Sequence, residues 1–306
     1  MNPSISVVIC TYSCERWSDL CAAVTSVHNQ TYPPNDVVVV IDHNLDLYNR
    51  ALESLPGTRV IENSETRGLS GARNTGINSV SAEIVAFLDD DAVATPHWLE
   101  NLVAVYTNPF VIGVGGAIEP MWQTRRPRWF PLEFDWVVGC TYTGMPRERA
   151  SVRNLIGANM SFRRDVFIKY GGFRNNMGRV MSVPTGCEET ELCIRVRQYG
   201  PERQLLYEPK ARILHRVPAS RARWSYFQSR CYFEGLSKAL VSRLVGARDG
   251  LASERAYTLH TLPSGILRGM SDFVLHADIS GVTRAGAIMA GLILTTAGYL
   301  KGSLFG

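Results

Sequence analysis

The sequence lacks the cysteine pattern of a disulfide framework and of a zinc site. Its seven cysteines are an odd number, are scattered along the chain and form no Cys-x-x-Cys pair. Disulfide frameworks need paired cysteines, and structural zinc sites usually need closely spaced ones. Single unpaired thiols are typical of proteins kept in a reducing compartment, so we expect a cytoplasmic protein.

The chain also has little that indicates export or a membrane span. The first residues, MNPSISVVIC, carry no basic stretch before the apolar run, so we expect no signal peptide. No stretch reaches the roughly 20 apolar residues of a spanning helix. The nearest stretch, residues 285–300, is interrupted by glycine and threonine, and we expect a helix packed on the body, a half-inserted anchor or a dimer interface there.

Neither sign of charge is in large excess, because the formal net charge is only +4 over 306 residues. Such a balance does not favour nucleic acid as a partner, whereas it is compatible with anionic substrates or an anionic membrane surface. With 45% hydrophobic and 20% charged residues, the composition is that of an ordinary folded protein. The length suits one large α/β domain or a domain with an appendage.

What the sequence does contain is an alternation of apolar strands and amphipathic helices. The first half has predicted strands at 4–10, 37–41, 59–62 and 84–88, and predicted helices at 17–28 and 72–80. This alternation predicts an α/β fold whose mostly parallel central sheet is flanked by helices. The second half has strands at 111–116 and 154–164, a hairpin-like pair at 205–208 and 211–214, a helix beginning at 188, a loop at 243–250 and a helix at 257–275.

Polar side chains follow the first four predicted strands. They are Thr11, Asp42, Asn63 and the run Asp89-Asp90-Asp91. Ligands of a parallel sheet bind outside the carboxyl ends of its strands, so these residues predict a ligand-binding edge. No Gly-x-Gly-x-x-Gly follows the first strand, which counts against a nicotinamide enzyme.

Residues 83–96, EIVAFLDDDAVATP, place three carboxylates directly after a buried strand. On an extended chain Asp89 and Asp91 point to one side and Asp90 to the other. Three adjacent negative charges repel one another without a cation, and their hard oxygen ligands suit Mg²⁺ or Mn²⁺. The alternative interpretation is a solvated acidic turn.

Several motifs, in this order, resemble the family 2 glycosyltransferases. They are Thr11-Tyr12 after the first strand, Asp42 after the second, Arg67-Gly68 followed by Ala72-Arg73-Asn74, and Asp89-Asp90-Asp91. The resemblance runs from Ser4 to Lys238 and implies the fold called GT-A, with a helical C-terminal extension beyond it. The chain is most similar to actinobacterial-type members described as glucosyl or glucuronosyl transferases acting on polyprenyl-phosphate sugars.

This resemblance implies a nucleoside-diphosphate sugar as donor and Mn²⁺ or Mg²⁺ as cofactor. Asp91 is the expected direct metal ligand, with Asp89 and His215 as further ligands. The residues expected at the nucleotide sugar are Thr11, Tyr12, Glu15, Asp42, Asn63, Arg67, Gly68, Arg73, Asp89, Asp90 and Asn159. Uracil is the base that the family favours, although His43-Asn44 stands where members usually carry a second acidic residue and Gly-Ser.

A carboxylate pair begins the predicted helix at residue 188. Glu188-Glu189 stands where the family usually has Glu-Asp, and the second residue of that pair is the family's general base for the acceptor hydroxyl. The resemblance therefore implies Glu189 as the base, with Glu188 as the alternate. The helix dipole also stabilises acidic residues at a helix start, which offers a purely structural explanation.

An aromatic segment at residues 121–144 has no clear periodicity. Its rings could stack on a sugar, and its arginines, residues 125, 126 and 128, could hold an anionic group. Alternatively, the aromatic side chains simply cover the sheet.

The resemblance implies an inverting transferase whose acceptor is a lipid-linked sugar or another glycoside. We expect a catalytic domain at 1–240, with a nucleotide half at 1–118 and an acceptor half at 119–240, and a helical extension at 241–306. The extension would make peripheral contact with the inner face of the membrane or form a homodimer. The rival functions are a nucleotidyltransferase, which would need a glycine-rich phosphate loop near the first strand, and a non-catalytic sugar-nucleotide or carbohydrate-binding protein.

Overall fold

The computed structural model of the chain describes residues 3–175, 177 and 186–305. The chain divides into two compact units. Unit 1 comprises Met1–Glu119 and Pro146–His215, and unit 2 comprises Pro120–Met145 and Arg216–Gly306. The domain boundaries expected from the sequence, at residues 118 and 240, stay a prediction.

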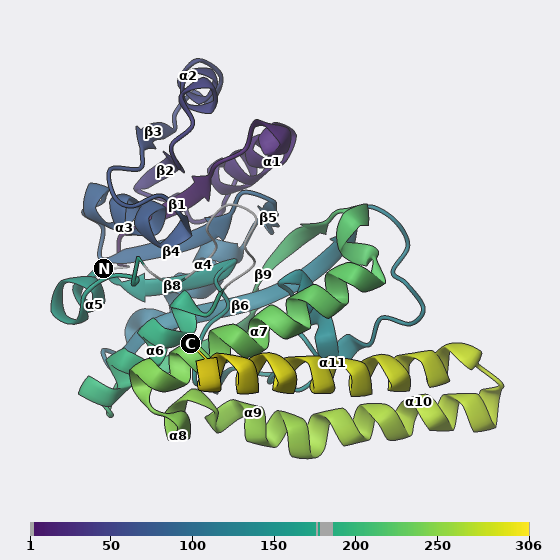
Figure 1. Cartoon of the computed structure of the whole chain (residues 1–306). Coiled ribbons are helices and arrows are strands. Elements are labelled where there is room, and N and C mark those ends of the chain that lie inside the picture. The colour runs from purple at the N-terminus through teal and green to yellow at the C-terminus, as the bar shows by residue number, and fades with distance from the viewer. Residues whose placement is uncertain (1–2, 176, 178–185, 306) are drawn as a thin grey trace. The chain divides into compact units, whose positions relative to one another are not determined.

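Unit 1 begins with the alternation of strands and helices that the sequence predicts (Figure 1). Strands β1 (Ile5–Thr11), β2 (Asp36–Ile41), β3 (Arg59–Glu62) and β4 (Ile84–Asp89) are parallel neighbours in the order β3-β2-β1-β4. The connecting helices are α1 (Trp17–His28), α2 (Leu45–Ser54) and α3 (Leu69–Ser79). The apolar runs form strands here because both faces of the sheet are covered, as the complete burial of Val38, Val39 and Val40 indicates.

The other strands of the sheet come from both segments of unit 1. Strand β8 (Asn159–Arg163) pairs antiparallel with β4, and the order continues β8-β6-β9-β5. The bounds are β6 Val111–Trp122, β9 Gln204–Val217 and β5 Ala92–Ala94, and the short β7 (Ala150–Ser151) pairs with β9. Helix α4 (Trp98–Val103) follows β5. The predicted α/β fold with a helix-flanked central sheet is therefore confirmed. The sheet is mixed and not mostly parallel, however, because the pairings that β8, β5 and β7 make are antiparallel.

Three local predictions are wrong. Residues 205–214 form no hairpin, because they belong to the single strand β9. The strand predicted over 154–164 begins only at Asn159 and is followed by helix α5 (Arg164–Tyr170). The predicted loop at 243–250 is almost wholly helical.

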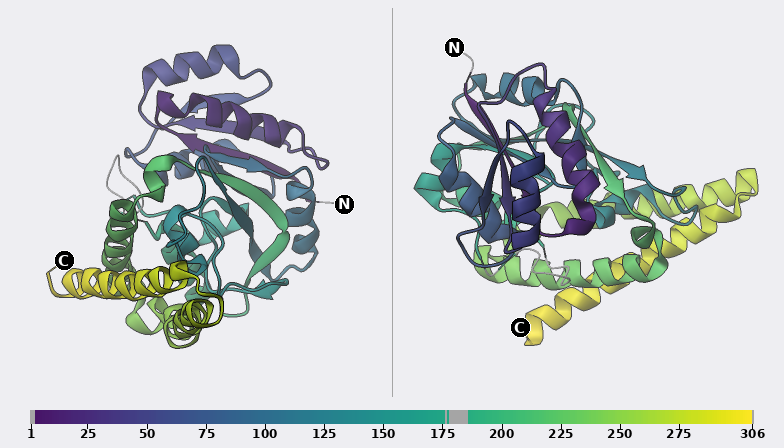
Figure 2. Two further views of the ribbon diagram at one scale, coloured as in Figure 1. Left: turned by 90° about the vertical axis from the view of Figure 1, so that its right-hand side faces the viewer. Right: turned by 90° about the horizontal axis from the view of Figure 1, so that it is seen from above.

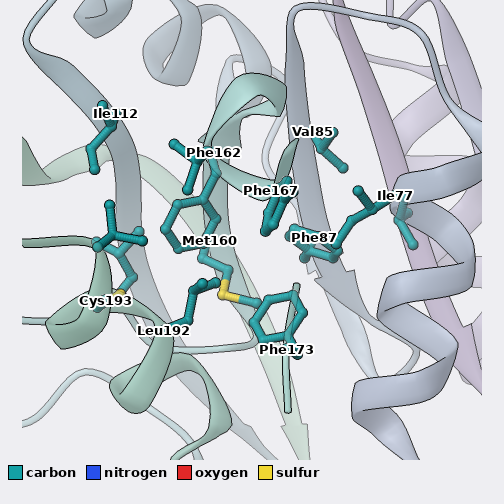
Figure 3. Packing of buried hydrophobic residues seen from close by; sticks show 14 of the residues in the cluster. Ile77, Val85, Phe87, Ile112, Met160, Phe162, Phe167, Phe173, Leu192 and Cys193 are labelled. Atoms are coloured by element: carbon teal, nitrogen blue, oxygen red, sulfur yellow. The ribbon is translucent and has the colours of Figure 1, made fainter. Parts of the chain in front are cut away.

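The core of unit 1 lies between β4, β8 and helix α6 (Glu188–Tyr199), as Figure 3 shows. The rings of Phe87 and Phe173 meet edge to face with centroids 5.6 Å apart. Leu192 and Cys193 of α6 are completely buried in the same cluster as Met160 of β8. This packing fixes the first turn of α6 relative to the end of β4.

Unit 2 is mainly helical. Its helices are α7 (Trp224–Val245), α8 (Ala247–Gly250), α9 (Ala252–Ala256), α10 (Leu262–His276) and α11 (Ile279–Phe305), with a π-helical turn at Tyr257–Thr261. Helix α11 packs against both α7 and α10 (Figure 2). The sequence predicts no stretch as long as a spanning helix, and this prediction is wrong. By length and composition, Ile279–Leu304 is long and apolar enough to cross a membrane.

The aromatic segment packs inside unit 2. The ring centroids of Trp129, Phe130 and Phe227 lie 5.3 to 5.6 Å apart. Arg126 donates two hydrogen bonds to Asp135, at 2.6 and 3.1 Å. Burial raises the pKa of Asp135 to about 6, although Arg126 opposes the shift. The guanidinium of Arg126 is thus engaged within the protein.

Candidate active site

The end of β4 carries the three aspartates to the edge of the sheet. Asp89 is the last residue of β4, and a tight turn leads directly into β5. Strand β5 pairs antiparallel with β9 in a register that places Ala92 opposite His215. The short reversal after β4 therefore brings a histidine beside the aspartates, although more than a hundred residues separate them in the sequence.

Asp89, Asp91 and His215 form a compact cluster of possible metal ligands. One ligand atom from each lies within 4.8 Å of the others, and His215 Nε2 is 3.1 Å from Asp91 Oδ1. Asp91 and His215 are buried, whereas Asp89 is partly exposed. Two carboxylates and one imidazole can hold a divalent cation. The structure thus brings together the three predicted ligands, and ligation itself stays a prediction.

Asp90 points elsewhere, as the alternation of an extended chain predicts. It accepts a hydrogen bond from Thr11 Oγ1 at 2.7 Å and one from Arg16 Nη1 at 2.8 Å. Burial raises the pKa of Asp90 to about 6, the charge of Asp91 adds to the shift, and Arg16 opposes it. Thr11 and Asp90, both expected at the nucleotide sugar, are therefore bonded to each other.

Arg16 is a site residue that the sequence analysis missed. Its Nη1 is 2.8 Å from Asp90 Oδ1 and 3.4 Å from Asp91 Oδ2. The three adjacent carboxylates were a signal that a cation should lie nearby, but nothing in the pattern selected this arginine. Arg16 supplies a fixed positive charge to the acidic turn.

Asp42 is the centre of a second polar cluster, at the ends of β2 and β3. Its Oδ1 accepts from Asn63 Nδ2 at 2.7 Å, and its Oδ2 accepts from the Gly68 amide at 2.9 Å. His43 Nδ1 lies 2.9 Å from the same carboxylate, and Arg67 donates to the His43 carbonyl at 3.1 Å. Gly68, with φ of +128°, can present its amide because it has no side chain. The structure thus groups four of the predicted nucleotide residues with His43.

Tyr12 and Glu15 lie on the loop that follows β1. The Tyr12 carbonyl accepts from Asn44 Nδ2 at 2.9 Å, and Asn44 also caps the start of α2. The Tyr12 ring and Glu15 are exposed. Both residues therefore remain available to a ligand at this edge of the sheet, and their role there stays a prediction.

Arg73 links the cluster of possible metal ligands to the start of α6. Its side chain is almost completely buried, and its Nη1 donates to Glu188 Oε1 at 2.6 Å. Its Nη2 donates to the Gly157 carbonyl at 3.3 Å and lies 3.6 Å from Asp89 Oδ1. The rings of Phe87 and Phe173 lie beneath the guanidinium. Arg73 thus forms an internal ion pair with Glu188, and its expected place at the nucleotide sugar stays a prediction.

The two glutamates that begin α6 have different surroundings. Glu188 is buried against Arg73, whereas Glu189 is only partly buried. Cys187 ends the preceding segment in the left-handed region, with φ of +71°, which turns the chain into the helix. One carboxylate is thus directed inward and its neighbour is left accessible.

Asn159 is enclosed by the sheet. Its Oδ1 accepts from Trp98 Nε1 at 2.8 Å, and its Nδ2 donates to the carbonyls of Ala117 and Ala211 at 3.0 and 2.8 Å. The side chain is fully buried. These bonds tie β6 and β9 to β8, and contact between Asn159 and a sugar stays a prediction.

Comparisons with protein families and with curated proteins give matches over much of the chain. The family model described as glycosyl transferase family 2 matches residues 6–171. A glucosyl-dolichyl phosphate glucuronosyltransferase of Haloferax volcanii is 33% identical over 304 residues, which cover 98% of this chain and 96% of that protein.

Two solved structures illustrate the similarity of the fold. One is the mannosyltransferase PcManGT from Pyrobaculum calidifontis, in complex with GDP-Man and Mn²⁺, which has a TM-score of 0.61 at 18% sequence identity. The match covers 96% of this chain and 87% of PcManGT. GalNAc-T7 with UDP, GalNAc and Mn²⁺ has a TM-score of 0.51 at 16% identity, with 90% of this chain covering 58% of that one. The chain belongs to glycosyl transferase family 2 and is a glycosyltransferase with the GT-A fold.

Proposed function

We propose that the protein is an inverting glycosyltransferase that moves a sugar from a nucleoside-diphosphate sugar to the hydroxyl of a lipid-linked sugar. The observation that carries this proposal is that Arg73 lies beside Asp89 of the Asp89, Asp91 and His215 cluster and also binds Glu188, the first residue of the glutamate pair. A nucleotide edge, a possible cation site and a carboxylate base are the parts that such a transfer needs.

The acceptor oxygen needs a base, and Glu189 suits that task better than Glu188. Glu188 is buried and paired with Arg73 at 2.6 Å, so its carboxylate is engaged in an ion pair. Glu189 is partly exposed and lies in the first turn of α6, where the helix dipole stabilises negative charge. Glu189 therefore takes the hydroxyl proton as the acceptor oxygen bonds to C1 of the sugar. The bond from C1 to the diphosphate breaks on the opposite face, which inverts the anomeric centre.

The proposed metal ligands are Asp91, Asp89 and His215. Their mixture of carboxylate oxygen and imidazole nitrogen favours Mn²⁺, and Mg²⁺ is the alternative. When bound, such an ion would neutralise charge on the diphosphate leaving group. Arg16 holds Asp90 in place beside this cluster and offers a further positive charge to the same edge.

The donor and acceptor classes rest on different support. The nucleobase pocket is proposed at Asp42, Asn63, Arg67 and Gly68, with uracil as the preferred base. The acceptor follows the relative whose name gives a glucosyl-dolichyl phosphate, since that protein aligns with nearly the whole chain. We therefore propose a UDP-sugar donor, a polyprenyl-phosphate sugar acceptor and a site of action at the inner face of the membrane.

A thermal-shift panel with UDP, GDP, dTDP and CDP tests the nucleotide site. A ligand at about 100 times its dissociation constant adds roughly 2.7 kcal/mol to the free energy of unfolding. We expect a Tm increase with UDP that requires Mn²⁺ and is lost in Asp91→Asn. If none of the four nucleotides raises the Tm above that of the ligand-free protein, with or without Mn²⁺, the proposed site is overturned.

A further inference from the structure

Helices α10 and α11 of unit 2 have an inverted distribution of side chains. Their large apolar residues face outward: Val274, Leu275 and Ile279, around the turn between the helices, are 73%, 71% and 72% exposed. On α11 the exposed apolar residues continue along the helix at Val282, Met289, Ile293, Leu300 and Leu304. In water such a contiguous apolar surface is unfavourable, and it usually marks a binding surface.

These exposed residues lie on one face of α11. From Ile279 to Leu304 they follow one another at intervals of three, seven, four, seven and four residues, which are the intervals of a single helical stripe. The segment Ile279–Leu304 is apolar enough to cross a membrane, yet only 28% of an apolar stretch of 18 residues within it is buried in the protein. The stripe therefore needs a covering that the described part of unit 2 does not supply.

Helices α10 and α11 approach each other closely at small residues. Gly269 of α10 lies against Gly281 of α11 so closely that a Cβ on Gly269 would come 2.5 Å from the Gly281 carbonyl oxygen. Helix α11 approaches α7 in the same way, because a Cβ on Gly235 would come 2.0 Å from the Thr295 carbonyl oxygen. Helices that pack through small residues while their large apolar side chains face outward are typical of lipid surroundings.

The charges near the turn are paired. Helix α11 carries only two charged residues, Arg284 and Lys301. Arg284 lies 2.7 Å from Asp272 of α10 and 3.2 Å from Asp278 in the turn. Pairing lowers the cost of bringing these groups close to an apolar phase, so the turn can approach a bilayer together with its exposed Val274, Leu275 and Ile279.

We propose that the turn between α10 and α11, together with the outer stripe of α11, docks into the interfacial layer of a lipid bilayer. This inference rests on the proposed function, because a lipid-linked acceptor would be presented at that same surface. A bilayer is favoured over a second copy of the chain because the stripe is long, continuous and apolar, and because the relative over nearly the full chain acts, by its name, on a dolichyl phosphate. The helices lie in the interface and do not span, since small residues of α11 pack against α7 and α10.

Vesicle flotation of the purified full-length chain tests this proposal. The probe is vesicles of phosphatidylcholine mixed with phosphatidylglycerol, and the variant is the triple substitution Val274→Glu, Leu275→Glu and Ile279→Glu. Because all three side chains are exposed, the fold should persist, and the partition coefficient should fall by at least about a hundredfold. The matched control is Ile168→Glu on α5, which alters an apolar side chain that is 71% exposed and should float like the wild type.

Two results would overturn the docking surface. One is a wild-type chain that stays with the soluble fraction, and the other is a triple variant that floats equally well. A wild-type dimer that the triple variant dissociates, without vesicle binding, would assign the stripe to a second copy. The UDP and Mn²⁺ thermal shift of the triple variant keeps the two proposals apart, because it reports the nucleotide site whether or not the stripe binds lipid.

Discussion

Neighbouring side chains of the candidate site have different contacts. Glu188 turns inward to Arg73, and Glu189 stays accessible at the start of α6. Asp90 similarly turns to Thr11 and Arg16, and Asp91 faces His215. In both pairs, adjacent carboxylates are therefore held in different surroundings.

The first residue-scale prediction concerns the buried pair of Arg73 and Glu188. Replacing Glu188 with Gln leaves the Arg73 guanidinium buried without its closest countercharge, so the free energy of unfolding should fall by about 3 kcal/mol. Urea denaturation measures the change. Glu53→Gln, at an exposed position of α2, is the control and should leave stability unchanged. A Glu188→Gln variant as stable as the wild type would show that the pair is not a structural element.

The second residue-scale prediction concerns pH. Burial raises the pKa of Asp135 to about 6 from an ordinary 3.8, so the folded state binds this proton more tightly than the unfolded state. The stability contribution of Asp135 is therefore greatest below pH 4 and declines as the pH rises to 6, by about 1 to 3 kcal/mol. The difference between wild type and Asp135→Asn in urea denaturation should decline over that window. A difference that is constant from pH 4 to pH 6 would contradict the raised pKa, and Asp46→Asn on the surface of α2 serves as the control.

At the scale of elements, strands β6, β8 and β9 are brought into close contact around Asn159. A Cβ on Gly116 would lie 1.7 Å from the Ala211 carbonyl oxygen and 2.5 Å from Asn159 Nδ2. Only a glycine therefore permits this approach of β6 to β9.

Gly116→Ala should consequently lower the free energy of unfolding by at least about 2 kcal/mol, since the clash involves backbone. Gly286→Ala is the matched control, because nothing lies within 4 Å of a Cβ at that helical position. Alanine there should raise stability by up to about 1 kcal/mol through helix propensity. Thermal unfolding of both variants measures the contrast, and equal Tm values would contradict the proposed strand contact.

Elements with a strong local pattern were predictable from the sequence. The parallel strands β1 to β4 are unbroken apolar runs, and burial on both faces gives them that composition. Strand β9 was not recognised because Pro209 interrupts its pattern in the manner of a turn. The chain stays extended there, with the Lys210 amide donating to Glu208 Oε1 at 3.0 Å and with β7 and β5 pairing with different parts of the strand.

The site was predictable only where its residues are close in sequence or share a motif. The three aspartates are consecutive, and they could be recognised as a possible cation site. Arg16 and Asp90 are 74 residues apart, and Arg73 and Glu188 are 115 apart. Such pairings depend on the sheet order and on the packing of α3 and α6, and neither is encoded in a local pattern.

At the scale of the whole molecule, the family model and the Haloferax volcanii relative match different lengths of the chain. The family model covers residues 6–171, whereas the Haloferax volcanii relative aligns with 98% of the chain and so includes the C-terminal helices. The sequence similarity to that relative therefore extends over the helices of unit 2. Its apolar outer stripe fits a transferase whose acceptor carries a lipid.

Sugar transfer by the Glu189→Gln variant tests whether Glu189 is the base. The assay follows UDP release and product formation from UDP-glucuronic acid or UDP-glucose, with a polyprenyl-phosphate glucose acceptor and Mn²⁺. Loss of a general base should lower the rate by about a hundredfold or more, while the UDP and Mn²⁺ thermal shift persists. A Glu189→Gln variant that transfers sugar as fast as the wild type would contradict Glu189 as the general base.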